Sequence, residues 1–382
     1  MTNKLAKIIF VVTEDWFFCS HRISIAKAAL SEGYDVRVVT QVNKHKNIIE
    51  SAGIKVIPFK ISRSGYNPLS EIKTFLSLYK IYEREKPFLL HHVALKPILY
   101  GTIAASLVRT PIIINAVTGL GYVFTSNRLS AKIIKPILLP VLKIVLNLKN
   151  TYTIFQNEDD KKLLRGNKKS TGSNSIIIRG SGVDLNYYTP STDKSLSPRV
   201  ILASRMLIDK GIREFVEAAR IVKKDFRDAK FVLAGDTDSG NPSMISKAML
   251  DEWKREGIIE WEGYQENIVD ILQTSNIACL PSYREGMPKF LLEAASCGLP
   301  IVATDVPGCR EIVVNNKNGL LVPPKDPKLL ADAIKILISD KKLRERFGKE
   351  SRRLIENIFS SEIINKQTMD LYKSLFRKNE YN

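Results

Sequence analysis

The sequence predicts an α/β protein with two doubly wound domains whose parallel sheets face each other across a cleft. Short runs of β-branched and other apolar residues alternate with amphipathic stretches of helical length along the whole 382-residue chain. The alternation occurs twice, over residues 7–180 and 199–325, and a segment rich in Ser, Thr, Asp and Pro separates the two series at 186–198. Because the predicted strands are apolar throughout, they fit parallel sheets that are covered on both faces.

Each series supplies enough strands for a sheet of its own. In the first series the predicted strands are 7–13, 36–40, 55–60, 88–93, 111–117, 152–156 and 175–179. In the second series they are 200–203, 230–234, 258–261, 277–280, 301–304 and 320–322. The clearest helical patterns are 21–31, 69–85, 212–224, 290–297 and 327–338. We therefore predict an N-terminal domain at 1–185 and a C-terminal domain at 199–356.

The last helical pattern, residues 360–376, has no strand after it. It could close either domain, and we predict that residues 357–382 complete the N-terminal one. Doubly wound sheets bind their ligands outside the carboxyl ends of the strands, so two facing domains would bind theirs in the cleft between them.

Positive charge is concentrated in the first half of the chain. The net charge is +18, and residues 1–190 hold 27 Lys and Arg against 12 Asp and Glu, whereas the remainder holds 31 against 28. Between Glu85 and Glu158 there are basic residues but no acidic one. Such one-sided charge indicates an anionic partner for the N-terminal half, either phospholipid, a diphosphate-bearing substrate or nucleic acid.

The sequence predicts a cytoplasmic protein. The apolar run at 8–12 ends too early for a signal peptide, no stretch of about 20 uncharged apolar residues occurs, and four cysteines without metal-ligand spacing fit a reducing compartment. Residues 128–150 mix lysines with a strongly apolar face. They could form a helix on an anionic membrane surface or a core helix with solvated lysines, and the acid-free neighbourhood favours a peripheral position on the membrane.

The densest chemical signal is the segment from Leu280 to Ala294. A buried strand ends, a turn with Gly and Pro follows, and a helix begins near Pro288, which leaves free backbone N–H groups for an anion. Glu285 in the turn and Glu293 on the helix could accept hydrogen bonds from neighbouring sugar hydroxyls. The alternative is a pair of solvated surface carboxylates, but Glu293 stands among apolar residues, where an unpaired charge is costly.

A second basic constellation follows the strand 200–203. Arg205 and Lys210 lie five positions apart in a strand-to-helix loop, where a guanidinium fork and an ammonium group suit a diphosphate. An ordinary basic loop is the alternative.

Two other groups of residues invite functional interpretations. Asp236-Thr237-Asp238 could bind a divalent ion, but beside Ser and Gly it is more typical of a turn, so we predict no metal and no cofactor. His91 and His92 end a strand and His21 begins a helix, so one of them could point into the cleft; His92 is the strongest candidate.

Together these motifs resemble glycosyltransferase family 4, whose members have the GT-B fold and retain the anomeric configuration. The resemblance rests on Arg205 with Lys210, on the Glu285-x7-Glu293 pair, and on further shared segments at 182–184, 305–311 and 318–322. It is dense over residues 199–350 and looser in the N-terminal half.

The resemblance implies a role for each motif residue. Arg205 and Lys210 would hold the diphosphate of a nucleotide-sugar donor, Glu293 would take the ribose hydroxyls, and Glu285 would face the donor sugar. The strand at 258–263 and its loop, which continues into Tyr264, would flank the base. Contacts to sugar or phosphate would come from Gly286, Met287, Pro288 and Lys289. The expected catalytic residues are Glu285, Lys210, Arg205 and His92.

Residues 62–68 and 117–122 resemble the branch that acts on polyprenyl-diphosphate-linked sugars in bacterial surface glycan synthesis. The expected reaction moves a hexose or N-acetylhexosamine from a nucleotide diphosphate sugar, for which UDP is favoured, to such an acceptor. The alternatives are a sugar-nucleotide epimerase or hydrolase of the same fold, and a basic nucleic-acid-binding module. The last would need aromatic residues among the basic ones, whereas the acid-free stretch is aliphatic.

Overall fold

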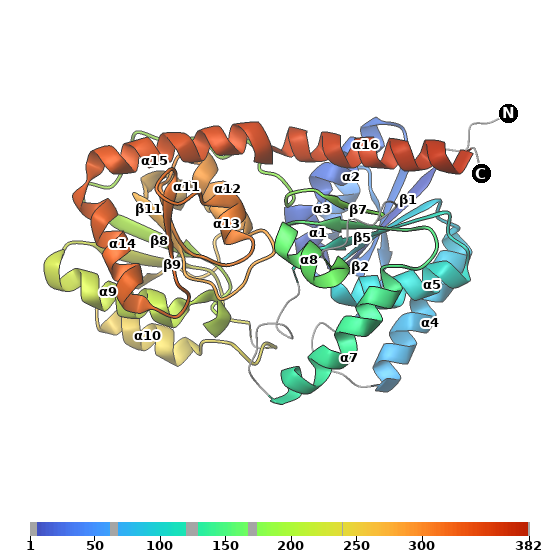
Figure 1. Ribbon diagram of the computed structural model, residues 1–382, viewed down its shortest axis with the longest axis horizontal. Helices are drawn as coiled ribbons and strands as arrows, with labels where there is room; N and C mark the ends of the chain where they lie inside the picture. Colours follow the sequence, from blue (N-terminus) through green and yellow to red (C-terminus); the bar gives the residue numbers. More distant parts are fainter. Residues whose placement is uncertain (1–5, 62–67, 120–128, 167–173, 239, 381–382) are drawn as a thin grey trace. The chain divides into compact units, whose positions relative to one another are not determined.

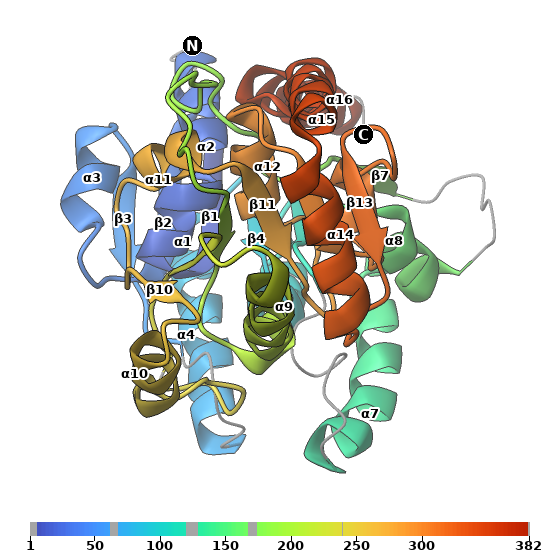
Figure 2. The same cartoon turned by 90° about the vertical axis from the view of Figure 1, so that its left-hand side faces the viewer.

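The computed structural model describes residues 6–61, 68–119, 129–166, 174–238 and 240–380. The chain forms two compact units, and the first is discontinuous in sequence. Unit 1 comprises Met1–Ser181 and Glu362–Asn382, and unit 2 comprises Gly182–Ser361. Each unit is a single parallel sheet with helices on both faces (Figures 1 and 2). The predicted α/β class with two doubly wound sheets is confirmed.

Unit 1 holds a seven-stranded sheet in the order β3-β2-β1-β4-β5-β6-β7. The chain builds one edge first and then returns to β4 beside β1, which is the doubly wound pattern. Its strands are β1 (Lys7–Glu14), β2 (Asp35–Gln41), β3 (Lys55–Pro58), β4 (Leu89–Val93), β5 (Ile112–Val117), β6 (Thr151–Phe155) and β7 (Ser175–Ile177).

Unit 2 repeats the arrangement with six parallel strands in the order β10-β9-β8-β11-β12-β13. The reversal falls between β8 and β11, so the loops after these two strands lie side by side at one edge. The strands are β8 (Arg199–Ala203), β9 (Lys230–Ala234), β10 (Glu260–Trp261), β11 (Ile277–Leu280), β12 (Ile301–Thr304) and β13 (Gly319–Val322). All thirteen predicted strands are present.

The helices of unit 1 cover both faces of its sheet. They are α1 (Asp15–His21), α2 (Ile23–Ser31), α3 (Lys46–Ser51), α4 (Pro68–Glu85), the π-helical turn η1 (Pro97–Gly101), α5 (Thr102–Leu107), α7 (Leu129–Val145), α8 (Glu158–Arg165) and α16 (Ser361–Glu380). The single helix predicted at 21–31 is wrong at its start. A break at Arg22, with φ −132° and ψ −15°, separates α1 from α2.

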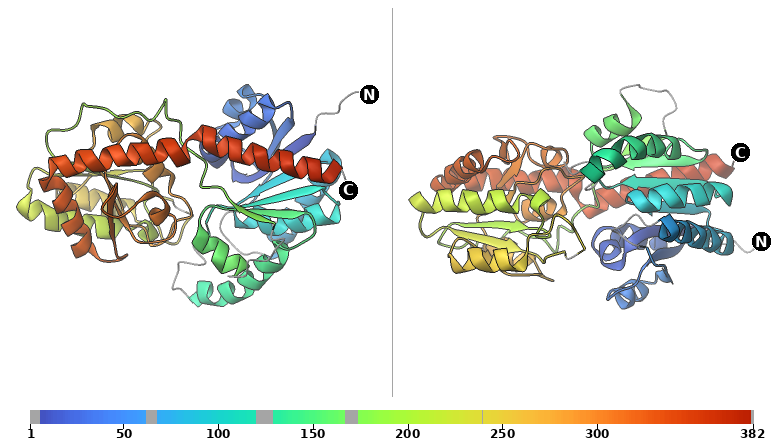
Figure 3. Two further views of the ribbon diagram at one scale, coloured as in Figure 1. Left: turned by 45° about the horizontal axis from the view of Figure 1, so that its top comes forward. Right: turned by 90° about the horizontal axis from the view of Figure 1, so that it is seen from below.

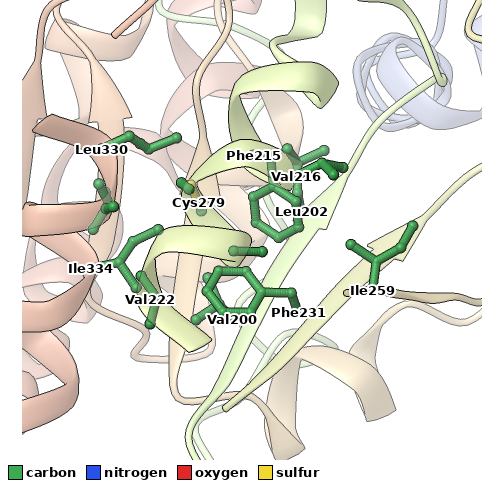
Figure 4. Close-up of a cluster of buried hydrophobic side chains, with 14 of the residues drawn as sticks. Val200, Leu202, Phe215, Val216, Val222, Phe231, Ile259, Cys279, Leu330 and Ile334 are labelled. Atoms are coloured by element: carbon green, nitrogen blue, oxygen red, sulfur yellow. The ribbon is translucent and has the colours of Figure 1, made fainter. Parts of the chain in front are cut away.

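In unit 2 the two faces are covered by helices from successive crossovers. These are η2 (Ile208–Lys210), α9 (Ile212–Asp225), α10 (Lys247–Arg255), α11 (Val269–Thr274), α12 (Lys289–Ser296), α13 (Cys309–Ile312), α14 (Pro327–Ser339), α15 (Lys341–Leu354) and η3 (Ile355–Phe359). Between the sheet and helices α9 and α14 lies an apolar core that includes Val200, Phe215, Phe231 and Ile334 (Figure 4). This core packs against β8 through Val200 and Leu202 and so supports the strand that leads into the next loop.

The C-terminal helix α16 packs on the sheet of unit 1, more than 180 residues away from the rest of that unit in sequence (Figures 1 and 3). Its Ile364, Met369, Tyr372 and Leu375 are buried in the core that β1 and β4 share. The Tyr372 hydroxyl lies 2.5 Å from Nδ1 of His91 on β4. One face of the unit 1 sheet is therefore completed only by the end of the chain.

Helix α7 lies within residues 128–150, for which the sequence left open a core position or a position on a membrane surface. Leu142, Val145 and Leu146 are buried, whereas Ile137 and Ile144 are 64% and 65% exposed. The helix packs with one face and presents apolar side chains on the other. Among the described helices, none is both long and apolar enough to cross a membrane.

Candidate active site

Five loops meet at the carboxyl edge of the unit 2 sheet, those after β8, β9, β10, β11 and β12. The loop after β8 touches the loop after β11, because Tyr283 donates its backbone N–H to the Asp209 carbonyl at 2.9 Å. Gly211, with φ +74°, permits this approach: a Cβ there would lie 2.1 Å from the Pro281 carbonyl oxygen. The two motifs that the sequence singled out separately are thus in contact.

Lys210 and Glu285 form an ion pair across these loops. The Lys210 Nζ lies 2.6 Å from Glu285 Oε1, and the side chains are only 20% and 10% exposed. Ser282 also donates its hydroxyl to Glu285 Oε1, at 2.6 Å. Thr304 on β12 in turn donates its hydroxyl to the Ser282 carbonyl. The carboxylate of Glu285 is therefore held from two sides, with its second oxygen left for other contacts.

Arg205, directly after β8, is held by a different carboxylate. Its Nη1 donates to Asp238 Oδ2 at 2.6 Å, and 41% of the Arg205 side chain remains exposed. Since an exposed ion pair of this kind is weak, an anion such as a diphosphate can compete with Asp238 for the guanidinium.

Glu293 lies on α12, and the residue is 9% exposed. The Tyr188 hydroxyl donates to Glu293 Oε1 at 2.8 Å, and Lys289 Nζ lies 3.3 Å from the same oxygen. Burial and the Glu293 charge raise the pKa of Tyr188, so its phenol stays protonated and donates this hydrogen bond. The burial that the sequence predicted for Glu293 is confirmed, and its charge is paired.

The loop after β12 supports the turn that carries Glu285. The backbone N–H of Glu285 donates to the Pro307 carbonyl at 3.3 Å. Gly308 has φ +81°, and a Cβ there would lie 2.6 Å from the Gly286 carbonyl oxygen. Met287 is buried and Pro288 precedes the first turn of α12. This packing fixes the stretch from Gly286 to Lys289 at the amino end of the helix.

The loops after β9 and β10 complete the edge next to Arg205. Gly235 donates its N–H to the Gly263 carbonyl at 2.6 Å, and its own carbonyl accepts from the Trp261 indole at 2.9 Å. Tyr264 follows and is 67% exposed. A large aromatic ring at the rim of a site is available for stacking against a planar ligand group.

His92 lies in unit 1 and is buried, which differs from the expectation that it faces a cleft. Its Nε2 lies 3.0 Å from the Tyr82 hydroxyl and its Nδ1 lies 3.0 Å from Asn115 Oδ1. Burial lowers the pKa of His92 to about 4, so the ring is neutral at physiological pH. These contacts make His92 a structural group of β4, and we do not retain it among the proposed catalytic residues.

The other two histidines that the sequence suggested for the site also have local partners. His91 is buried against Phe10 and Tyr372, and burial lowers its pKa well below the ordinary range. His21 stacks on Phe17 with a centroid distance of 4.1 Å, and its Nδ1 lies 2.6 Å from the Ser20 hydroxyl.

Two sequence-based expectations remain, one about a metal ion and one about the segments that resemble enzymes of lipid-linked sugars. Within the part of the chain that the structure describes, no group of three or more His, Cys, Asp or Glu side chains is placed to hold a metal ion. Asp238 is engaged by Arg205. Residues 62–67 and 120–122, which carry the resemblance to enzymes of lipid-linked sugars, lie outside the described residues.

Three residues that contact the site were not predicted to belong to it. Tyr188 falls in the segment that reads as a linker, and nothing in its sequence neighbourhood signals a contact 105 residues away. The sequence favours a turn at Asp238, and only the strand order shows that its loop lies beside that of Arg205. Ser282 lies within the segment from Leu280 to Ala294. Its position three residues before Glu285 is the one sequence signal that could have indicated their hydrogen bond.

Comparison with known proteins shows which family the chain resembles. Residues 191–354 match the family described as "Glycosyl transferases group 1", and residues 7–157 match the family described as "Glycosyl transferase 4-like". A Campylobacter jejuni protein, "N,N'-diacetylbacillosaminyl-diphospho-undecaprenol alpha-1,3-N-acetylgalactosaminyltransferase", is 30% identical over 86% of this chain and 89% of its own length. The Staphylococcus aureus "Capsular polysaccharide biosynthesis glycosyltransferase CapM" is 27% identical over 91% of both chains.

Solved structures show the same fold. The Anabaena protein HepE, crystallised with UDP-glucose, superposes with a TM-score of 0.77 at 18% identity, over 96% of this chain and 99% of that one. WaaG, a glycosyltransferase of lipopolysaccharide biosynthesis, gives 0.71 at 12% identity over 95% and 99%.

The chain belongs to glycosyltransferase family 4, the group 1 glycosyl transferases, and has the GT-B fold. It is a retaining enzyme that uses nucleotide sugars. The resemblance on which the sequence analysis rested is confirmed.

Proposed function

We propose that this enzyme transfers a hexose or N-acetylhexosamine from a UDP-sugar to a polyprenyl-diphosphate-linked sugar during bacterial surface polysaccharide or glycan synthesis. The observation that carries the donor half is the gathering of Lys210, Glu285 and Arg205 on neighbouring loops at one strand edge, with Glu293 on helix α12, which follows the Glu285 loop. The acceptor half is supported by the relatives, among them an Escherichia coli enzyme named as an undecaprenol-diphosphate galactosyltransferase at 26% identity.

In this proposal the donor lies along the carboxyl edge of unit 2. Arg205 and Lys210 hold the diphosphate together with the backbone from Gly286 to Lys289 at the start of α12. Glu293 accepts hydrogen bonds from the ribose hydroxyls, and Tyr264 lies beside the base. A UDP donor is supported by the structurally similar HepE, which was crystallised with UDP-glucose.

The proposed chemistry is a front-face displacement. The acceptor hydroxyl attacks the anomeric carbon on the side from which the diphosphate leaves, which retains the configuration. Arg205 and Lys210 stabilise the negative charge that develops on the leaving diphosphate, and the diphosphate takes the proton of the attacking hydroxyl. Glu285 faces the donor sugar and keeps Lys210 in place through their ion pair.

A lipid-linked acceptor defines where the enzyme works. We propose a cytoplasmic enzyme that is peripheral on the inner face of the cytoplasmic membrane. Unit 1 supplies the acceptor side in this proposal, because the excess of positive charge that suits a diphosphate-linked lipid lies in the first half of the chain.

The test is a panel of nucleotide sugars scored by thermal stabilisation, followed by transfer assays with a polyprenyl-diphosphate sugar. We expect one UDP-sugar to stabilise the enzyme and a new disaccharide lipid to form only when the acceptor is present. Turnover of the nucleotide sugar to an epimer or a free sugar at the same rate without acceptor would contradict the proposal and identify an epimerase or hydrolase.

The Lys210–Glu285 pair makes a direct prediction. Lys210→Ala and Glu285→Ala should each lower kcat by at least about 100-fold, because each removes charge stabilisation or positioning at the reacting diphosphate. Lys335→Ala is the matched control, since Lys335 also forms an ion pair in unit 2, with Asp225 on the outer helices. Near-normal turnover in either site variant would contradict the assignment.

A further inference from the structure

Helices α4 and α7 of unit 1 both carry apolar side chains on their outer faces. On α4, Leu69, Ile72 and Leu76 are 71%, 56% and 48% exposed. Their spacing of three and four residues places them on one side of the helix, opposite Leu78, which is fully buried. The exposed face of α4 thus carries a stripe of three apolar residues, not one isolated apolar side chain.

The face of α7 is built in the same way. Ile137, Val141 and Ile144 are 64%, 37% and 65% exposed and follow each other at four and three residues. Leu142 and Val145, which are turned away from this stripe, and Leu146 just after the helix pack in a core cluster with Phe155 and Leu164. We call the six exposed residues on α4 and α7 together the outer apolar surface.

Both helices expose basic residues, and those of α4 lie beside its apolar stripe. Lys73 and Lys80 are exposed on α4, and helical periodicity places them within about 40° of Leu69, on the same side. Lys135 and Lys143 are exposed on α7, but helical periodicity turns them about 160° and 120° away from Ile137, outside its apolar stripe. The first acidic residue of α4, Glu71, is paired with Lys96 at 2.8 Å, and α7 contains no acidic residue. Exposed Glu83 also lies within about 40° of Leu69, so this side of α4 carries two lysines against one carboxylate. The net charge around the outer apolar surface is therefore positive.

The two helices belong to one edge of unit 1. Both pack against η1, and Figures 1 and 2 show the amino-terminal ends of both at the same lower edge of the unit. Singly exposed apolar residues are common on protein surfaces, but contiguous exposed stripes mark interaction sites. Apolar stripes with flanking lysines match a bilayer surface, in which acyl chains lie beneath anionic head groups.

We propose that the outer apolar surface docks unit 1 on an anionic phospholipid bilayer, with the six apolar side chains entering the interface and Lys73 and Lys80 of α4 contacting lipid phosphates. This deepens the proposed function, because it names the lipid surface on which the polyprenyl-linked acceptor would be met. The surface itself can be tested without any sugar transfer.

The experiment measures binding of the full-length protein to vesicles by flotation. Wild-type protein should bind vesicles rich in phosphatidylglycerol and bind phosphatidylcholine vesicles far less, and added salt should weaken the binding. Ile72→Glu with Leu76→Glu, and separately Ile137→Glu with Ile144→Glu, should each lower the partition coefficient by about tenfold or more. Lys73→Gln with Lys80→Gln should weaken binding by about fivefold per lysine on anionic vesicles alone.

The matched control is Leu329→Glu with Ile336→Glu on α14 of unit 2. These residues are 44% and 51% exposed on one helix, so the control makes the same change of charge and hydrophobicity outside the outer apolar surface. We expect the control to bind like wild type. A loss equal to that of the α4 and α7 variants, equal wild-type binding to both kinds of vesicle, no vesicle binding, or tighter binding to RNA would each overturn the proposal.

A second assay separates this proposal from the proposed function. With a short-chain, water-soluble acceptor, the α4 and α7 variants should transfer sugar as fast as wild type, whereas transfer to a long-chain acceptor in vesicles should fall with vesicle binding. If neither acceptor is used but the variants lose vesicle binding, the proposed function fails and the docking surface stands. If vesicle transfer is unchanged in variants that no longer bind vesicles, the docking surface has no role at the acceptor and this proposal fails.

Discussion

At the scale of single residues, the candidate site is organised by hydrogen bonds that leave one carboxylate oxygen available. Glu285 Oε1 accepts from Lys210 and Ser282, and Glu293 Oε1 accepts from Tyr188. In each case the hydrogen-bond donors converge on a single oxygen. A carboxylate fixed in this way can present its other oxygen to a sugar or ribose hydroxyl without first losing rotamer freedom.

Tyr188 makes this idea testable. Tyr188→Phe should raise KM for the UDP-sugar by about tenfold while kcat changes little, because a hydrogen bond to a charged group is lost and Glu293 is no longer held. The effect should shrink with a donor whose ribose lacks the 2′- and 3′-hydroxyls. Tyr187→Phe is the matched control, since the neighbouring hydroxyl bonds Asn267 instead. An equal loss with both donors would mean that Tyr188 acts only through general stability.

His92 predicts a pH dependence of stability. Its folded-state pKa of about 4 lies below the ordinary value of 6.5, so the unfolded chain binds more protons between these two values. The contribution of His92 is therefore fully present above pH 6.5 and is lost as the pH falls toward 4, by up to ~3 kcal/mol.

Urea unfolding across this range should show a steeper loss of stability for wild type than for His92→Gln. His91 remains in both proteins, so the difference isolates His92. Parallel pH profiles would show that the ring is not buried in its neutral form.

At the scale of elements, the site depends on loops that can approach each other closely. Gly308 packs on the Gly286 carbonyl, and the Glu285 backbone leans on the loop after β12. The position of Glu285 is therefore set by a loop more than twenty residues further along the chain.

Gly308→Ala tests this dependence. The added Cβ would lie 2.6 Å from the Gly286 oxygen, so the turn that carries Glu285 must shift, and kcat should fall by about tenfold or more. Gly257→Ala is the matched control: its φ of +71° imposes a similar backbone strain, but nothing lies within 4 Å of its Cβ. Comparable activities of the two variants would contradict the role of loop packing.

The elements also show how far sequence reasoning reaches. Thirteen strands and the motif loops were predictable, because apolar runs report burial and the motif loops follow predicted strands. The break at Arg22 and the burial of His92 were not. His92 is enclosed by partners on other elements, Tyr82 of α4 and Asn115 of β5, and Arg22 interacts with Tyr372 of the distant α16. Partnerships such as Arg205 with Asp238 were likewise out of reach, because strand order decides which loops are neighbours.

At the scale of the whole molecule, the chain enters unit 2 once and returns once. Helix α16 contributes buried side chains to unit 1, and His91 reaches Tyr372 across 281 positions of sequence. Unit 1 therefore depends on a segment that lies beyond unit 2, whereas unit 2 is a continuous stretch with its own core.

Removing residues 361–382 should unfold unit 1 selectively. Hydrogen exchange should show loss of protection in β1 and β4, while β8 and β11 remain protected. Removing residues 377–382 alone is the control, because Leu375 is the last residue of the buried set on α16. Protection of β1 in the long truncation would show that the unit 1 sheet does not need its terminal helix.

The late return of α16 has a consequence for biosynthesis. The ribosome delivers the seven strands of unit 1 first, then all of unit 2, and the helix that covers the unit 1 sheet last. Unit 2 can therefore reach its final form while the older half of the nascent chain still has an uncovered apolar face. The half that is translated first is the half that finishes folding second, and during that interval it is the natural client for a chaperone.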